Sequence, residues 1–343
     1  METARLRLRR FCVRRLCHTS SSRAGGVIPS AAMKKLLAVV AMLAGVAAAQ
    51  GQAPSQAPNF TLKKIGEGVY AAISPDGSKA GSNAGFIVGD GGVVVVDSFI
   101  DPIPAQEMLR EIRKISKLPV LYLVNTHYHL DHTGGNAVFA DADARIVAQR
   151  NLRGWERTEN LKFFGANPKP EQQARVEALV LPDLVYTEEL DIYAGSRLVQ
   201  VRYMRGHTGG DSVVLVPDAN VVFGGDLIWR AHLPNLIDAS TAPWLQTLEK
   251  LVADHPAATF VPGHGDVATA ADVRDFHDYL AALRQAVAKG QAEGKSGQAL
   301  VDAVSPMIQE KYGAWGFKGF VQRNIEQTAA ELAGTKKIPV PAE

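Results

Sequence analysis

The residues between Asn125 and Asn136 have the strongest chemical character in this chain. The segment reads Asn-Thr-His-Tyr-His-Leu-Asp-His-Thr-Gly-Gly-Asn, so six consecutive positions contain His127, His129, Asp131 and His132. The 343-residue chain has only 9 histidines in all. Imidazole and carboxylate are ligands that zinc and similar cations accept. The alternative is a polar loop that collects four titratable residues by chance, and the local density of histidine argues against it.

Three later segments place a histidine or an aspartate among glycines, next to an apolar run. They are Arg-Gly-His207-Thr-Gly-Gly, Phe-Gly-Gly-Asp226 and Pro-Gly-His264-Gly. Each is a weak signal by itself, because a lone histidine after a strand is usually a surface residue. Glycine lets the backbone turn sharply there and present a side chain at the end of a sheet. Together with the first cluster they supply seven ligands, enough for two metals with a coordination position left open.

Strands and helices alternate around these residues. Apolar runs predict a hairpin about Gly89–Gly92 and a buried strand at 120–124, directly before the first cluster. Helical spacing predicts helices at 104–116 and at 270–289, the second capped by Thr269. The segment 163–189 is expected to be a long, partly helical insertion that forms a wall or lid. The alternation indicates an α/β layered domain, and the hairpins argue against a purely parallel sheet.

The first fifty residues differ in composition from the rest. Met33-Lys34-Lys35 precedes an apolar run that ends in Ala-Ala-Ala49, the pattern of a secretory signal, and we expect cleavage after Ala49. The residues before Met33 are rich in arginine and serine. They read either as a transit peptide or, more simply, as the result of a start codon misassigned upstream of Met33. We therefore expect a leader at 1–49, a linker at 50–59, and an exported protein, periplasmic or secreted, without a stable membrane anchor.

Composition limits the chemistry and the partners. Both cysteines, Cys12 and Cys17, lie in the leader, so the mature chain can form neither a disulfide nor a thiolate metal ligand. A formal net charge of +2 and a charged fraction of 21% provide no basic field for nucleic acid. A small-molecule substrate is the expected partner, and the sequence carries no signal for an oligomeric state.

The motif from His127 to His132, taken with the three later segments, resembles the metallo-β-lactamase superfamily. The resemblance implies a four-layer αββα sandwich over residues 60–267, with metals at one edge between two sheets, and a C-terminal helical extension at 268–343. Matched position by position, the first metal's ligands are His127, His129 and His207. The second metal's ligands are Asp131, His132 and His264, and Asp226 matches the bridging carboxylate.

Short sequence motifs around the predicted ligands, including Ser82-Asn83, are similar to those of the first true β-lactamase subclass. The ligand residues themselves differ from that subclass. Asp226 stands where that subclass has a cysteine, and His132 adds a ligand after the HxHxD motif. In that subclass a lysine binds the substrate carboxylate, and the matching position in this chain is Trp229. Arg230, the next residue, could take the place of that lysine. The all-His/Asp site is similar to that of glyoxalase II and of other hydrolases in the superfamily. The cysteine-containing motif that characterises glyoxalase II is absent from this chain.

The resemblance implies an exported, zinc-dependent hydrolase in which a metal-bridging hydroxide attacks a β-lactam amide, a lactone or a thioester. Two Zn(II) ions are expected, with iron or manganese as alternatives, and Asp131 is expected to bind the second metal and orient the hydroxide. The rival hypotheses are a phosphodiesterase of the same superfamily, a di-iron redox protein and a non-catalytic zinc module. The redox hypothesis is disfavoured because no added segment is long enough for a flavin domain.

Several residues near the predicted ligands are candidates for roles around the metals. The segment 225–234 is expected to leave the site as a loop, which makes four residues candidates for contact with substrate: Trp229, Arg230, His232 and Asn235. Of these, His232 fits better as a bystander. His255 and His277 lie in predicted helices and are assigned no role. Asp97 follows the strand at 93–96 and is expected to fix a histidine ring rather than to bind metal.

Overall fold

The computed structural model describes residues 58–339. Two β-sheets face each other in this part of the chain, and helices cover the outer face of each. The predicted leader, the cleavage site after Ala49 and all but the end of the linker lie outside the described residues.

The first sheet has seven strands in the order in which they occur in the chain. Strands β1 to β4 pair antiparallel as hairpins, and β4 to β7 pair parallel. The tight hairpin about Gly89–Gly92 is present between β3 and β4. The strands are β1 (Thr61–Gly66), β2 (Val69–Ile73), β3 (Ala84–Val88), β4 (Val93–Val96), β5 (Val120–Val124), β6 (Arg145–Gln149) and β7 (Leu184–Tyr186).

The second sheet has five strands in the order β12-β11-β10-β9-β8. Its pairs are antiparallel except for β11 and β12, which run parallel. The strands are β8 (Glu189–Ala194), β9 (Arg197–Tyr203), β10 (Ser212–Val216), β11 (Val221–Trp229) and β12 (Thr259–His264). Both sheets are therefore mixed, as the hairpins in the sequence predict.

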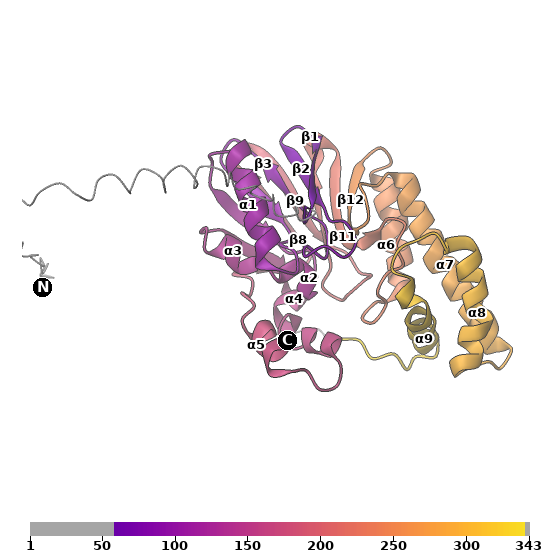
Figure 1. Ribbon diagram of the computed structural model, residues 1–343. Coiled ribbons are helices and arrows are strands. Elements are labelled where there is room, and N and C mark those ends of the chain that lie inside the picture. The colour runs from indigo at the N-terminus through magenta and orange to yellow at the C-terminus, as the bar shows by residue number, and fades with distance from the viewer. Residues whose placement is uncertain (1–57, 340–343) are drawn as a thin grey trace, which may run out of the picture. The chain divides into compact units, whose positions relative to one another are not determined.

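Apolar side chains alternate between the two faces of each strand, so one core lies between the sheets and one lies between each sheet and its helices. Three cores of this kind separate four layers. In β4, Val93 and Val95 contact the helices while Val94 and Val96 contact the second sheet, which explains why all four are buried. In β11, Val222 packs against helices while Phe223 faces the first sheet. Figure 1 shows α1 and α3 on the outer side of one sheet and α6 and α7 on the outer side of the other. The predicted αββα sandwich is confirmed.

Helices on the first sheet are short apart from α1, which begins after Asp101 caps its amino end. On the second sheet, α7 starts with the predicted capping box between Thr269 and Asp272 and packs against α6, α8 and α9. The helices are α1 (Pro102–Ile115), α2 (Leu130–Thr133), α3 (Asn136–Ala140), α4 (Arg150–Trp155), α5 (Pro170–Glu177), α6 (Thr241–Asp254), α7 (Ala270–Ala292), α8 (Gly297–Tyr312) and α9 (Val321–Leu332), with 3-10 turns η2 (Asn160–Phe164), η3 (Pro217–Ala219) and η4 (Lys318–Phe320).

Two expectations about the chain need correction. The segment 163–189 includes α5, as expected, but its end forms β7, the edge strand of the first sheet. The segment 225–234 does not leave the site wholly as a loop, because β11 continues to Trp229. The pairing of β11 with β12 shifts register on both sides of Gly225. The strand therefore continues through the two glycines at which the sequence predicts its end.

No helix within residues 58–339 combines the length and the apolar character needed to cross a membrane.

Candidate metal centre

All seven side chains predicted as ligands meet at one edge of the sandwich. His127 and His129 follow the end of β5, and Asp131 and His132 lie in the single turn α2 that comes next. The second sheet supplies the remaining three: His207 follows β9, Asp226 lies within β11, and His264 ends β12.

The side chains form two groups, which meet at Asp226. The first contains His127, His129, His207 and Asp226, and the second contains Asp131, His132 and His264; within each group the ligand atoms lie within 4.8 Å of one another. One carboxylate oxygen of Asp226, Oδ2, lies 3.2 Å from His207 Nε2 and 3.7 Å from His127 Nε2. The other, Oδ1, lies 3.1 Å from His132 Nε2 and 3.4 Å from His264 Nε2. Each oxygen of Asp226 thus faces a different group.

Several polar atoms in this cluster are buried and lack a hydrogen-bond partner within residues 58–339. They include His127 Nε2, His132 Nε2 and Asp226 Oδ1. A buried polar atom without a partner is unfavourable by about 1–3 kcal/mol. Divalent cations would satisfy these atoms, and the donor set of imidazoles and carboxylates suits such ions. The residues present therefore fit a metal centre.

Asp97 fixes one histidine from each group. Its Oδ2 accepts a hydrogen bond from His132 Nδ1 at 2.8 Å and another from the Thr126 hydroxyl at 2.8 Å. The same Thr126 hydroxyl lies 3.1 Å from His127 Nδ1, in position to accept a hydrogen bond from it. These contacts hold the protons on the Nδ1 atoms and leave the Nε2 lone pairs directed at the cluster. The contact between Asp97 and a histidine ring is the one predicted from the sequence.

Asp238 fixes the third ring and was missed in the sequence. Its Oδ2 lies 3.4 Å from His129 Nε2, so His129 presents Nδ1 to the cluster, 3.0 Å from His207 Nε2. Asp238 also accepts hydrogen bonds from the Tyr128 hydroxyl and from Lys162 Nζ. It lies in the loop between β11 and α6, where no apolar run or glycine pattern marks it.

Burial and charge shift the pKa values of the two groups differently. In the first group, burial lowers the pKa of His127 well below its ordinary value and that of His207 to about 3. In the second group, burial also acts to lower the pKa of His264, but Asp226 and Asp131 outweigh it and raise the pKa to about 9. Burial opposes ionisation of Asp131, yet His132 and His264 lower its pKa to about 2. Burial thus holds His127 and His207 neutral, whereas the nearby carboxylates favour the protonated form of His264, and Asp131 is ionised at neutral pH.

Glycine at position 263 makes room for Asp226. A Cβ atom built there would collide with Asp226 Oδ1. A side chain at position 263 would therefore displace the carboxylate on which both groups converge.

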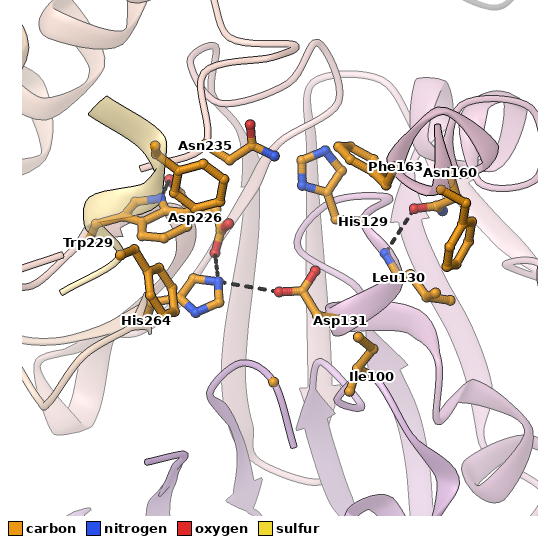
Figure 2. Close-up of a pocket in the computed structure, with 14 residues that line it drawn as sticks. Ile100, His129, Leu130, Asp131, Asn160, Phe163, Asp226, Trp229, Asn235 and His264 are labelled. Carbon is orange, nitrogen blue, oxygen red and sulfur yellow. Dashed lines mark hydrogen bonds and ion pairs between the residues drawn. The ribbon is translucent and has the colours of Figure 1, made fainter. Parts of the chain in front are cut away.

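A cavity of about 310 Å³ opens above the cluster. Figure 2 shows His129, Asp131, Asp226 and His264 in its wall, with Phe163 on one side and Trp229 on the other. Trp229 is buried and its ring is stacked on His264, with 4.2 Å between centroids and 24° between planes. Asn235 also lines the cavity, and Figure 2 shows its side chain directed toward His129.

Two residues expected near substrate lie outside the cavity lining. Arg230 is paired with Asp272, 3.1 Å away, and donates to the backbone oxygen of Val267, so it does not replace the missing lysine. His232 Nδ1 donates to Arg230 O at 2.7 Å, and its Nε2 pairs with Asp76 at 2.9 Å, consistent with a bystander.

The other two histidines lie away from the cluster. His255 follows the end of α6, and His277 lies on α7 beside Glu249 and Asp278.

Comparisons with known proteins agree with this geometry. The sequence model described as the metallo-beta-lactamase superfamily matches residues 78–264. The chain is 22% identical over 243 residues to the metallo-beta-lactamase type 2 of Bacteroides fragilis, covering 68% of this chain and 90% of that protein. It is also 22% identical over 271 residues to a linear primary-alkylsulfatase of a Pseudomonas species, covering 65% of this chain but only about half of that protein, 51%. A solved metallo-beta-lactamase from Pontibacter korlensis aligns with a TM-score of 0.52 at 23% identity, covering 65% of this chain and 99% of that one.

Fold and site together define a hydrolase with a His/Asp site for divalent metal. The chain belongs to the metallo-beta-lactamase superfamily. The family match ends at residue 264, so α7, α8, η4 and α9 lie beyond it.

Proposed function

We propose that this protein is an exported dizinc hydrolase that opens an acyl bond of a small molecule, with β-lactams, lactones and thioesters as the substrate candidates. One observation carries the proposal: the two oxygens of Asp226 face two different groups of ligands, so a single carboxylate can bridge two ions. A carboxylate shared between two groups of ligands suits the paired ions of hydrolytic sites.

The ligand roles follow from the two groups. His127, His129 and His207 would hold the first ion, Asp131, His132 and His264 would hold the second, and Asp226 lies where it would contribute to both. The groups contain imidazole and carboxylate only, a donor set that suits zinc; iron and manganese accept the same ligands. Zinc is the proposed native metal because neutral imidazoles dominate the first group.

The bound ions would lower the pKa of a shared water enough to provide hydroxide near neutral pH, and would polarise the substrate carbonyl. Asp131 is the catalytic residue of the protein itself. Its side chain is 25% exposed, ionised at neutral pH and directed at the cavity, so it can accept a hydrogen bond from the nucleophile and orient it.

Asn235 is the proposed hydrogen-bond donor to the substrate. Its Oδ1 accepts from the backbone amide of Ile237 at 3.1 Å, which directs the amide nitrogen away from that turn. In Figure 2 the amide group points across the cavity toward His129. A carbonyl oxygen bound over the cluster would lie within reach of this nitrogen.

The division of the chain is part of the proposal. Residues 1–49 act as the leader, 50–59 as a linker, 60–267 as the catalytic domain and 268–343 as the helical extension. The charged start and apolar run before Ala49 support export. Amino-terminal sequencing of the exported protein tests it, with Gln50 as the expected first residue.

A substrate screen tests the activity. Zinc-loaded protein is assayed with nitrocefin, a carbapenem, a lactone, a thioester, bis-p-nitrophenyl phosphate and dodecyl sulfate, the last because one relative is an alkylsulfatase. Turnover of at least one acyl substrate, with two zinc ions per chain, is the expected result. Turnover of the phosphodiester or the sulfate ester alone would contradict the proposal.

A further inference from the structure

Two separate segments supply aromatic walls to the cavity above the cluster. Phe163 and Phe164 come from η2, and Phe317 and Phe320 come from η4 and the residue before it. All four rings are half-buried. We call these four residues the aromatic walls, and the seven ligand side chains the floor.

The aromatic walls contact ligand rings on both sides of the floor. Phe163 meets His129 edge to face, with ring centroids 4.8 Å apart. Phe317 meets His264 with centroids 5.3 Å apart, and Trp229 at 5.9 Å. A substrate bound over the floor would therefore lie between rings from the two segments.

The position of Phe317 is built into the fold. Its backbone is left-handed, with φ 57° and ψ 38°, a conformation that is unfavourable for a residue with a side chain. Hydrogen bonds on its amino-terminal side hold it there: Gly316 N donates to Ala231 O at 2.8 Å, and Leu233 N donates to Gly316 O at 3.1 Å. This pairing ties the C-terminal extension to the loop after β11.

Helix α9 and the residues after it hold the same loop from the other side. Asn324 Nδ2 donates to Pro234 O at 2.9 Å. Lys336 Nζ donates to Leu236 O and Ala239 O at 2.6 and 2.5 Å. The extension therefore positions the loop that carries Asn235 and also lends its own rings to the cavity.

The cavity lining, taken over the described residues, includes no lysine and no arginine. Two cations nearby are paired with carboxylates: Lys162 with Asp238 at 2.5 Å and Glu159 at 3.0 Å, and Arg230 with Asp272. A third, Arg323, is exposed and lies over the ring of Phe320, 5.9 Å from its centroid, outside the lining of this cavity. The polar Asn160 is also engaged, since it accepts from Leu130 N and donates to Tyr128 O and Glu156 O. An anionic group held between the aromatic walls, away from the metal-binding floor, would lose its hydration without gaining a positive side chain from the cavity lining.

We infer that the C-terminal extension selects the substrate: Phe317 and Phe320 are specificity-determining residues that favour an acyl substrate whose scissile bond is flanked by an uncharged apolar or aromatic group. The inference rests on the proposed hydrolytic function. Both residues lie beyond the part of the chain that matches the superfamily, so the preference belongs to this chain's own extension. Rings packed on both sides of such a group bury its apolar surface, and its lack of charge avoids the desolvation penalty.

A binding experiment tests the inference without relying on turnover. Zinc-loaded protein is titrated with N-phenyl-1-naphthylamine and with 1-anilinonaphthalene-8-sulfonate, which share a ring skeleton and differ by one sulfonate. We expect the neutral dye to bind at least about tenfold more tightly. Phe320→Ser should weaken the neutral dye at least about fivefold. Tyr193→Ser, which removes a ring that is 63% exposed on β8, is the matched control and should change nothing.

A kinetic experiment tests the preference in catalysis. The substrates are p-nitrophenyl butyrate, which is neutral, and mono-p-nitrophenyl succinate, which carries a carboxylate on a chain of similar length. We expect kcat/KM to favour the butyrate by at least about tenfold. Phe317→Gly and Phe320→Ser should reduce that ratio, mainly by raising KM for the butyrate. Glycine at position 317 adopts the left-handed backbone readily, so this variant removes the ring and retains the turn.

The outcomes separate this inference from the proposed function. Zinc content and circular dichroism first establish that each variant is folded. Equal binding of the two dyes, or dye binding unaffected by Phe320→Ser, overturns the inference. So does a butyrate preference that survives both ring deletions. If the dyes behave as expected but no acyl substrate is cleaved by any form, the proposed function fails while the neutral apolar pocket stands.

Discussion

The floor and the aromatic walls of the cavity are held by different interactions. Six of the seven ligand side chains of the floor are buried, with His127 1% and His132 0% exposed, and carboxylates fix the histidine rings at distances as short as 2.8 Å. The seventh, Asp131, is 25% exposed at the cavity. The aromatic walls lie on single 3-10 turns, are half-buried, and contact the floor only through ring packing. Such turns have few internal hydrogen bonds of their own.

This difference separates chemistry from selectivity. The floor is built from the sandwich that the family shares, and its hydrogen-bond network determines which atoms face the metals. The aromatic walls come from the segment between β6 and β7 and from the residues after α8, beyond the family match. Substitutions in the floor should therefore change metal binding and rate together, whereas substitutions in the walls should change substrate preference alone. Four predictions test this division, from the largest expected effect to the smallest.

Asp226→Ala should have the largest effect, because it removes the carboxylate that faces both groups. We expect kcat/KM for an acyl substrate to fall at least about 10³-fold, beyond the 10–100-fold typical of a residue that only supports a ligand. Bound metal should fall below two ions per chain. Steady-state rates and elemental analysis measure the two quantities. Asp266→Ala, an aspartate 51% exposed and close in sequence to His264, is the control. Full activity in the Asp226 variant would refute the two-metal floor.

Asp97→Asn and Asp238→Asn should weaken metal binding by about 10–100-fold each, because each removes a charge that orients ligand rings. Asp97 supports one ring in each group and Asp238 supports His129 alone, so the Asp97 variant should affect both ions. Competition with a chromophoric chelator measures the affinities. Asp302→Asn, on the outer face of α8, serves as the control. Losses below about threefold would mean that the backbone alone orients the rings.

Glu156, which lies on the side of the cavity where η2 forms an aromatic wall, should make the free energy of unfolding depend on pH. Burial raises the pKa of this fully buried carboxyl from 4.5 to about 8, despite Arg157 and Arg153 nearby. The folded state thus keeps a proton that the unfolded state has lost, so stability is full below about pH 4.5 and falls as pH rises toward 8. The limiting slope is about 1.4 kcal/mol per pH unit.

Urea unfolding of the wild type and Glu156→Gln at pH 5, 6, 7 and 8 measures this dependence. The amide cannot ionise, so the free energy of unfolding of the variant should gain on that of the wild type with each step in pH. Parallel curves for the two proteins would show that Glu156 does not retain its proton in the fold.

Lys162→Met should have the smallest effect, although Lys162 joins a wall to the floor through its contact with Asp238. The lysine side chain is 29% exposed, and the buried Asp238 keeps its contacts with the Tyr128 hydroxyl and His129 when the lysine is removed, so the loss should stay near the roughly 0–1 kcal/mol of partly exposed ion pairs. We expect less than a threefold change in metal affinity and a change in unfolding free energy within that range. A loss of metal affinity as large as that of Asp238→Asn would show that floor and walls are not separable.

The floor was predictable from the sequence because its signals are local. The four residues from His127 to His132 follow one buried strand, and glycines beside His207, Asp226 and His264 mark where each is presented. Strand alternation and hairpins likewise gave the two mixed sheets, since period-2 burial is read directly from neighbouring residues.

The rest depends on contacts between distant segments. Phe317 reaches the cavity only because the turn after α8 pairs with the loop after β11, and nothing near Phe317 in the sequence signals that pairing. Asp238 gains its role from rings and a lysine on other elements. Arg230 was misplaced because β11 continues through Gly224-Gly225 and turns the arginine toward Asp272. Local patterns cannot determine where such side chains point.

Gly263 has a consequence for how this protein can evolve. Any other residue there would bring a side chain into the space of Asp226 Oδ1, so no series of small substitutions at that position can reshape the floor while activity persists. The residues Gly319 and Phe320 in η4 impose no comparable barrier, because a Cβ atom at Gly319 would meet no atom within 4 Å and the ring of Phe320 is half-buried beside the cavity. Adaptation to new substrates is therefore expected to proceed through substitutions in that turn. Homologous proteins that act on different substrates should differ in sequence there rather than at the metal ligands.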